Sequence, residues 1–378
     1  MSIRSARFEN FTVFDHAEFT FSPGVNVLIG KNGTGKTHVL KALYGMTEGS
    51  RRAHLDIDYE RGLSLLSIAQ EATKKNPSVD PETAAVFLFL SGVFSTTALA
   101  DSFPSLKRRR RTADNENQKI LLSMLLRSAT SPLTLELVNR RISLSTIPKK
   151  EQLTGPALYI PPREVLSMYS GFVELYVKYR LPFDRTYYDL CRLISGPLLR
   201  EVPPIFAELA KPLEAVLGGR VVLKGNGFVI ERDDGELDIS LEAEGLRKFA
   251  QILQLIANGS IEPGGCLFWD EPEANMNPKL VVVMKDFLIG LAKAGVQVFI
   301  ATHDYLLCRE LSLVSEYGAD RDLVRFFCLN KEQSTDPVTV ESGAVLADLQ
   351  HNPIVEEFAA HYDREARLFA GTSAANQE

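Results

Sequence analysis

Residues 30–37 read Gly-Lys-Asn-Gly-Thr-Gly-Lys-Thr, which matches the pattern GxxxxGK[ST] at every defined position. The apolar run GVNVLIG (24–30) precedes this loop and predicts a buried strand, whereas THVLKALYGM (37–46) follows it with helical spacing. A glycine-rich loop between a strand and a helix turns its backbone N–H groups inward around a phosphate, and the helix N-terminus adds the positive end of its dipole. The segment therefore predicts a P-loop nucleotide-binding site in an α/β protein.

The polar positions of this loop have distinct expected roles in binding ATP with Mg²⁺. We expect Lys36 to bridge the β- and γ-phosphates and the Thr37 hydroxyl to ligate Mg²⁺. The other expected nucleotide-binding positions shape the loop or supply N–H groups: Gly30, Asn32, Gly33, Thr34 and Gly35. A chance match to the pattern would occur in about one such chain in a hundred, and the strand and helix around it make chance rarer still.

A second motif, GCLFWDE (265–271), is an apolar strand that ends in two adjacent carboxylates. We expect Asp270 to hold Mg²⁺ and Glu271 to polarise the attacking water. An acidic turn after a core strand is the alternative interpretation. The loop 272–278 ends in a proline that can start the next helix.

One histidine follows the next predicted strand, in the segment FIATHD (299–304). A lone histidine is usually structural, but one at the tip of this strand can reach a γ-phosphate. We therefore predict that His303 takes part in catalysis beside Glu271.

Six segments in order resemble the ABC-type ATPases of the RecF, SMC and OLD-nuclease group, including stand-alone ATPases of bacterial antiphage systems such as PARIS and Septu. They are FENFTVFDHAEFTF, GKNGTGKT, YIPPREV, LEAEGLRKFAQ, CLFWDEPEANMNP and FIATHD. The resemblance covers both ends of the chain but not its middle. It implies an α/β fold: an ABC-type P-loop ATPase head whose mixed sheet has an N-terminal antiparallel portion, with a helical lobe inserted between the Walker A loop and the signature segment.

The resemblance also implies that two heads dimerise head to tail around ATP, as a homodimer or a higher homo-oligomer. The signature segment of one subunit would then bind the γ-phosphate held by the other, and Gly245 occupies its glycine position. Ala243 replaces the usual serine, so the contact in trans would rest on the backbone at Gly245. The lid position that often carries glutamine falls in 162–164 (PRE), which contains none.

The pattern along the chain predicts three parts. Residues 1–50 and 220–350 would form the ATPase core, 51–219 a mostly helical insertion with the lid segment 157–167, and 351–378 a helix with a disordered tail. Thr83 to Ala100 carries no charge, but an Asp-Pro-Glu start and several small polar residues favour a buried helix over a membrane span.

Composition narrows the functional classes. A formal net charge of −6 argues against a surface built throughout for nucleic acid, and the four separated cysteines suggest neither a zinc site nor a disulfide framework. We expect a cytoplasmic ATPase that controls a separate effector, a nuclease or toxin, in antiphage defence. A RecF-like repair ATPase that binds DNA through the basic run 107–111, and a scaffold that binds ATP without hydrolysis, are the alternatives. The DxD at 320–322 is interpreted as a solvated loop, since only some fifty residues follow it.

Overall fold

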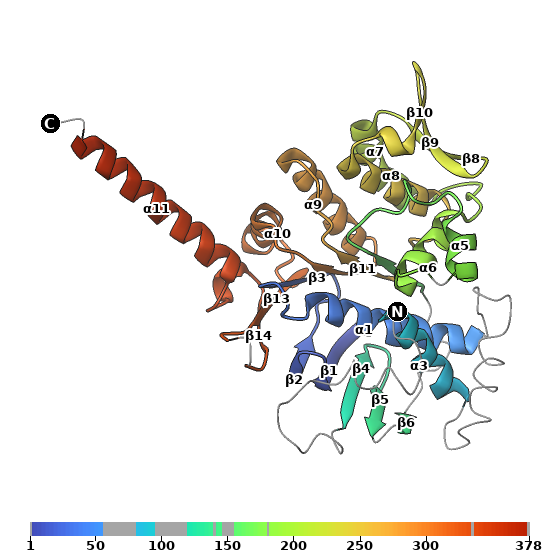
Figure 1. Cartoon of the computed structure of the whole chain (residues 1–378), viewed down its shortest axis with the longest axis horizontal. Coiled ribbons are helices and arrows are strands. Elements are labelled where there is room, and N and C mark those ends of the chain that lie inside the picture. Colours follow the sequence, from blue (N-terminus) through green and yellow to red (C-terminus); the bar gives the residue numbers. More distant parts are fainter. Residues whose placement is uncertain are drawn as a thin grey trace.

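The computed structural model describes residues 2–55, 81–94, 119–138, 141–145, 155–179, 181–333 and 336–375. It confirms the α/β fold class: a six-stranded, mostly parallel sheet and a five-stranded antiparallel sheet form the body of the described chain (Figure 1). A separate three-stranded antiparallel sheet lies at the edge of a helical lobe.

The six-stranded sheet brings the three predicted motifs together. Its order is β14 (Thr339–Gly343), β13 (Val324–Asn330), β3 (Val25–Gly30), β12 (Gln297–Ala301), β11 (Cys266–Asp270) and β7 (Ala157–Ile160). All neighbours pair in parallel except β13 with β14. Strands β3, β12 and β11 are buried on both faces, as their continuous apolar runs predict. Because these three strands are parallel neighbours, the segments that follow them meet at one edge of the sheet.

The antiparallel sheet has the order β2 (Phe14–Thr20), β1 (Ile3–Phe11), β4 (Ile120–Leu126), β5 (Leu133–Val138) and β6 (Arg141–Ser145). Strands β1 and β2 pair antiparallel and form the N-terminal antiparallel portion that the resemblance implies. The prediction of a mostly helical insertion over 51–219 is wrong for residues 120–145, which form three strands. β4 alternates between buried and half-buried positions, but its sequence ILLSMLL is apolar almost throughout, so the two-residue period does not show in residue type.

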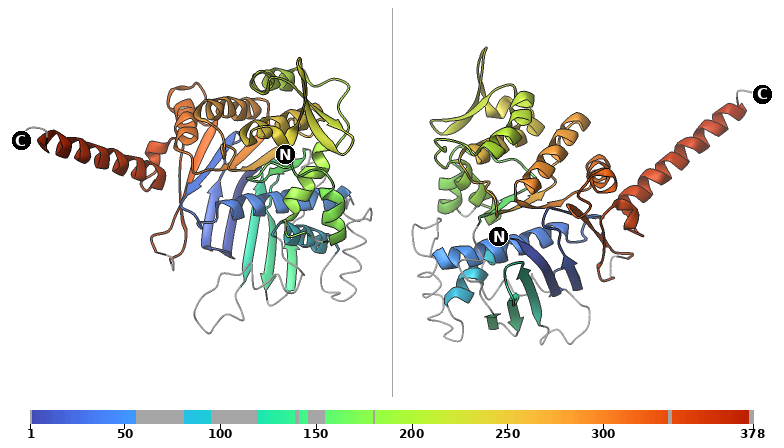
Figure 2. Two further views of the ribbon diagram at one scale, coloured as in Figure 1. Left: turned by 45° about the horizontal axis from the view of Figure 1, so that its top comes forward. Right: turned by 180° about the vertical axis from the view of Figure 1, so that it is seen from behind.

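The molecule is built in layers (Figures 1 and 2). Helices α1 (Lys36–Leu55) and α3 (Pro81–Val93) share one hydrophobic core with the antiparallel sheet and one face of the six-stranded sheet. Helices α8 (Glu244–Ala257), α9 (Pro278–Lys293) and α10 (Tyr305–Tyr317) share a second core with the opposite face. The first part of the segment Thr83 to Ala100 belongs to α3, whose buried residues face the core shared with the antiparallel sheet. This part of the segment is therefore a buried helix, as predicted. Along the described chain, no helix combines the length and apolar character needed to cross a membrane.

A helical lobe follows β7 and contains α5 (Phe172–Tyr179), α6 (Arg185–Ile194) and α7 (Pro204–Leu217). In this part of the chain the insertion predicted over 51–219 is helical, as expected. The strands β8 (Arg220–Lys224), β9 (Gly227–Arg232) and β10 (Gly235–Asp238) follow it and pair in antiparallel order. All four cysteines of the chain are buried, and none of them forms a disulfide.

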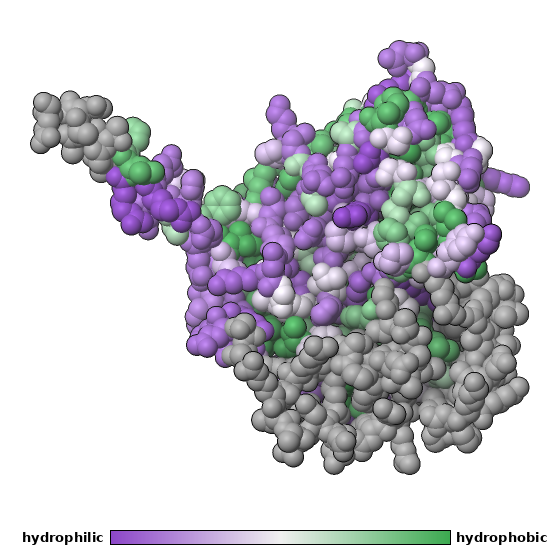
Figure 3. Space-filling model, in the orientation of Figure 1, coloured by the Kyte–Doolittle hydropathy of each residue, from purple (hydrophilic) through white to green (hydrophobic). Residues whose placement is uncertain are grey.

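The last helix, α11 (Pro353–Ala375), extends away from the body (Figures 1 and 2). At its base the Phe358 ring stacks on Tyr305 of α10, with the ring centroids 4.2 Å apart. Leu368 and Phe369 are exposed toward its outer end, where Figure 3 shows apolar side chains at the surface. The sequence predicted a disordered tail after about residue 369, whereas the helix continues to Ala375.

Candidate active site

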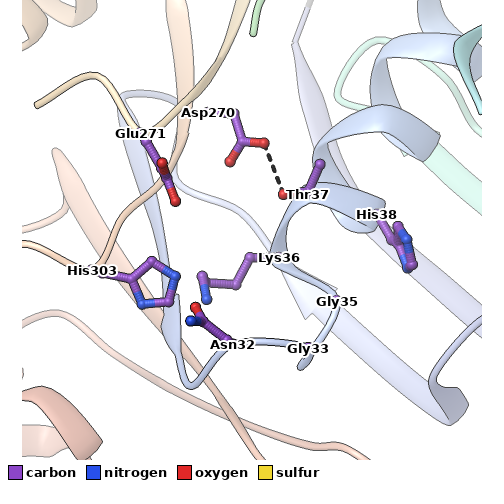
Figure 4. A pocket seen from close by; sticks show the side chains of 9 residues that line it. All are labelled: Asn32, Gly33, Gly35, Lys36, Thr37, His38, Asp270, Glu271 and His303. Carbon is purple, nitrogen blue, oxygen red and sulfur yellow. Dashed lines mark hydrogen bonds between the residues drawn. The ribbon is translucent and has the colours of Figure 1, made fainter. Parts of the chain in front are cut away.

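The segments after β3, β11 and β12 line one cavity of about 210 Å³ (Figure 4). Most of its lining residues were predicted from the motifs, and one of them, His38, was not. The lining residues are Asn32, Gly33, Gly35, Lys36, Thr37, His38, Asp270, Glu271 and His303. Figure 4 shows the Glu271, His303 and Lys36 side chains directed into the same space. The sequence therefore predicted the composition of this site from three separate motifs.

The phosphate-binding loop is held in shape by its own polar groups. Lys36 Nζ donates hydrogen bonds to the carbonyl oxygens of Gly30 at 2.8 Å and Lys31 at 3.1 Å. Thr34 is buried and its hydroxyl donates to the Lys31 carbonyl at 2.8 Å, so it braces the loop. Gly30 has a φ of +145°, and a Cβ there would lie 2.4 Å from the Leu329 carbonyl oxygen. That position accordingly requires glycine.

Lys36 carries the principal positive charge of the cavity. Burial lowers the pKa of Lys36 to about 8, while the neighbouring Asp270 and Glu271 act in the opposite direction. A phosphate group close to this amine would favour its charged form. The lysine is thus placed to bind phosphate as a cation.

The side-chain oxygens of Thr37 and Asp270 lie together and are suited to bind Mg²⁺. The Thr37 hydroxyl, at the start of α1, donates to Asp270 Oδ2 at 2.8 Å across the end of β11. Hydroxyl and carboxylate oxygens are ligands that Mg²⁺ prefers. Burial raises the pKa of Asp270 to about 6 and neighbouring Glu271 also raises it, although Thr37 and two lysines act against the shift. A buried carboxylate with a raised pKa is a group that a bound cation would stabilise.

The raised pKa of Asp270 predicts that Asp270→Asn stabilises the protein in the absence of Mg²⁺ and ATP. Since folding raises the pKa of this acid from 3.8 to about 6, the wild type loses stability as the pH rises through that window. Above about pH 6 the loss of stability is complete. It amounts to up to about 3 kcal/mol, at 1.36 kcal/mol per pKa unit. Melting temperatures at pH 4 and pH 8 test this: the advantage of the Asn variant should be small at pH 4 and full at pH 8.

Added Mg²⁺ and ATP supply the control for this experiment. They should raise the melting temperature of the wild type more than that of Asp270→Asn, because only the wild type keeps the metal-binding carboxylate. An Asn variant that is no more stable than the wild type at pH 8 would contradict the interpretation that the partners of Asp270 only partly offset the cost of burying its charge.

Glu271 and His303 face the cavity from adjacent strand ends. Glu271 has a left-handed backbone, with φ of +50°, and its N–H donates to the Ala301 carbonyl at 2.8 Å. Burial lowers the pKa of His303, and the charge of Lys36 lowers it further. The imidazole is therefore neutral at neutral pH, with one nitrogen that donates and one that accepts a hydrogen bond.

Two features of the site were not predicted. Glu273 is buried and accepts a hydrogen bond from the Thr302 hydroxyl at 2.6 Å, which ties the loop after β11 to the residue before His303. No pattern in the sequence indicates this contact, because the two partners follow different strands. His38, on the first turn of α1, also lines the cavity, and its position directly after Thr37 was the available signal.

Gly245 lies outside the cavity, in the first turn of α8. A Cβ there would lie 2.7 Å from the Asn275 carbonyl oxygen and 3.3 Å from Met276, so this glycine packs against the loop that follows Glu271 in its own chain. Ala243 is the N-cap of α8 and provides no side-chain hydrogen bond to the helix. The predicted role of Gly245 toward a partner's ATP remains a proposal.

The other candidate segments have simpler surroundings. In the lid segment, Glu164 is buried and forms an ion pair with Arg247 of α8, with oxygen and nitrogen 2.8 Å apart. Asp320, Arg321 and Asp322 are exposed in a turn before β13, as the solvated-loop interpretation predicted. The basic run 107–111 lies outside the described residues.

The sheet order, and the loop, carboxylate and histidine segments at its edge, are those of a P-loop protein with an ABC-type head fold. The chain belongs to the family described as "AAA domain, putative AbiEii toxin, Type IV TA system", which matches residues 25–309.

Solved structures and curated relatives resemble the chain to different extents. An SMC head bound to the C-terminal winged-helix domain of ScpA has a TM-score of 0.55 and 11% identity, covering 92% of this chain and 100% of that one, which shows the fold. The DNA replication and repair protein RecF of Chlamydia abortus is 40% identical over 57 residues, 15% of this chain and 16% of the relative. RecF of Cronobacter sakazakii is 39% identical over 57 residues, with the same coverage. The chain thus matches less than a fifth of the length of these relatives.

Proposed function

We propose that this chain is a regulatory ATPase that binds ATP with Mg²⁺, hydrolyses it and controls a separate effector protein, a nuclease or toxin, in antiphage defence. The observation that carries the proposal is the convergence of Lys36, Asp270, Glu271 and His303 on one cavity. These side chains are the parts that phosphoryl transfer to water requires. The description of the matched family, which refers to a type IV TA system, supports a role in defence.

In this proposal each group has a role in hydrolysis. Lys36 Nζ would exchange the loop carbonyls for the β- and γ-phosphates, which lie within reach of the same loop. Bound Mg²⁺, held through Thr37 and Asp270, would neutralise charge on the transferring phosphoryl group. Glu271 would orient a water molecule in line with the γ-phosphorus and accept its proton, while neutral His303 would donate a hydrogen bond to a γ-phosphate oxygen.

We also propose that two chains assemble head to tail around ATP. In this arrangement the N-terminus of α8, with Gly245, would approach the γ-phosphate bound by the partner subunit. Leu241 precedes this helix end and is 74% exposed, which suits a face that becomes buried on assembly. The SMC head of similar fold is bound to a second protein, ScpA, which supports the proposal that this head also carries a partner.

A mass measurement tests the switch directly. We expect the purified wild type to change its assembly state with ATP and Mg²⁺, and Glu271→Gln to remain in the ATP-bound assembly because it cannot complete hydrolysis. Light scattering after size-exclusion chromatography, with and without nucleotide, provides the measurement. An unchanged mass together with no phosphate release would contradict the proposal and favour a scaffold that holds ATP without turnover.

A RecF-like DNA-binding ATPase is the second candidate, favoured by the curated relatives. If this function is correct, duplex DNA should stimulate ATP hydrolysis. The apparent affinity for DNA should then fall steeply as the salt concentration is raised. The same phosphate-release assay, repeated with DNA at two salt concentrations, separates it from control of a protein effector.

A further inference from the structure

A buried lysine outside the cavity contacts the residue that carries the proposed chemistry. We propose that Lys248 is a positioning residue: it fixes the backbone of Glu271 for hydrolysis and couples that residue to the N-terminal end of α8. The inference rests on the proposed function, in which Glu271 polarises the attacking water.

Lys248 lies on the second turn of α8 and is 1% exposed. Its Nζ donates a hydrogen bond to the backbone carbonyl oxygen of Glu271 at 2.9 Å. Burial lowers the pKa of Lys248 to about 8, while the carboxylates of Glu273, Glu244, Glu271 and Glu164 act to raise it. A buried ammonium is costly unless specific partners hold it. An apolar side chain would fill this space at a lower cost, so the amine is expected to serve through its contact.

The carbonyl group that Lys248 contacts belongs to a residue with an unusual backbone conformation. Glu271 is one of the few described residues other than glycine with a positive φ, at +50°, a conformation that persists where surrounding contacts hold it. Its N–H is bonded to the Ala301 carbonyl at the end of β12, and its C=O to Lys248. These two bonds fix the planes on both sides of the Glu271 Cα, and therefore the direction in which its side chain leaves the backbone.

The same helix also contacts the loop that follows Glu271 and the lid segment. Gly245, one turn before Lys248, packs against the Asn275 carbonyl, and residues three apart in sequence lie on the same side of a helix. Arg247 pairs with Glu164, and the Gln251 side chain accepts from the N–H of Val165 at 3.0 Å. A displacement of the α8 N-terminus by a partner's nucleotide would thus reach Glu271 through Lys248.

The test compares Lys248→Met and Lys248→Arg with the wild type in steady-state phosphate release. Met keeps most of the apolar stem but removes the donor, so we expect kcat to fall about 10- to 100-fold, as for a misplaced catalytic group, with KM for ATP within about threefold of the wild type. Arg keeps a cation and N–H donors and should retain more of kcat than Met. The control is Lys211→Met, the same change at an exposed position of α7, which should leave kcat and KM unchanged.

Each result decides between the alternatives. Equal kcat values for folded Met and Arg variants, or a fall in ATP affinity without a fall in kcat, would overturn the positioning role and leave Lys248 as a packing residue. If Lys248→Met does not fold, Lys248→Gln replaces it: its side chain is one atom shorter, so wild-type kcat in that variant would overturn the proposal. If the wild type releases no more phosphate than a variant that lacks the Glu271 carboxylate, the proposed function itself is refuted.

Discussion

Replacing Glu271 with Gln should lower kcat for ATP hydrolysis by about 10²- to 10⁴-fold, the usual contribution of a positioned general base, while ATP still binds. The amide keeps the shape and the backbone contacts of Glu271 to Ala301 and Lys248, but it cannot accept a proton from water. The phosphate-binding loop and the Thr37–Asp270 pair are unchanged. Phosphate release under single-turnover conditions, with nucleotide binding measured separately, checks this separation of binding from chemistry.

A matched control is available on the loop that precedes the same strand. Glu262 is exposed, four residues before Cys266 at the start of β11, so Glu262→Gln changes the same charge without reaching the cavity and should keep wild-type kcat. Hydrolysis by Glu271→Gln at a rate close to that of the wild type would remove Glu271 from the catalytic role. Loss of ATP binding in that variant would show that the Glu271 carboxylate contributes to binding ATP rather than to the chemical step.

Most of the cavity was predictable because its residues occupy short contiguous motifs at the ends of apolar runs. The loop 30–37, the pair Asp270 and Glu271, and His303 each lie at the end of a strand whose sequence is mostly apolar. Parallel strands place their carboxyl ends on one edge of the sheet, so the motifs could be expected to meet before any coordinates were known. The adjacency of β3, β12 and β11 confirms that expectation.

The contacts that orient these residues were not predictable, because each joins side chains far apart in the chain. Lys248 meets the Glu271 carbonyl 23 residues away, and Thr302 bonds to Glu273 29 residues away. Neither pair leaves a spacing or a residue pattern that distinguishes it from other charged or polar positions. The three strands in 120–145 were missed for other reasons. The apolar residues of β4 occupy both faces and hide the two-residue period, whereas β5 (LTLELV) and β6 (RISLS) do alternate and could have been recognised as strands.

The largest expected effect on stability comes from Arg52, at the far end of α1 from the phosphate-binding loop. Its guanidinium donates to Glu48 Oε1 at 2.8 Å and to Asp189 Oδ1 of α6 at 2.9 Å, and it lies over the Phe89 ring of α3. The Arg52 side chain is 4% exposed, and those of Glu48 and Asp189 are 2% and 3% exposed. Replacing Arg52 with Met removes the cation between two buried carboxylates, which typically costs about 3–5 kcal/mol.

Denaturant unfolding of Arg52→Met should therefore show a much lower free energy of unfolding than the wild type. Arg51→Met is the matched control: Arg51 also pairs with Glu48, but its side chain is 23% exposed, so we expect a loss of about 1 kcal/mol or less. A loss as large as that for Arg52 would show that Glu48, rather than the link between α1 and α6, determines the stability.

The pH dependence separates a charge effect from a loss of packing. Burial acts to raise the pKa of Glu48, but Arg52 and Arg51 together lower it below its ordinary value. A lowered carboxylate pKa contributes stability above the pKa of the unfolded chain, and that contribution is lost as the pH falls through the folded value. The difference between Arg52→Met and the wild type should then shrink as the pH is lowered below about 4, near the ordinary pKa of glutamate. A difference that stays constant over that range would mean that Arg52 stabilises the junction of α1, α3 and α6 by packing alone.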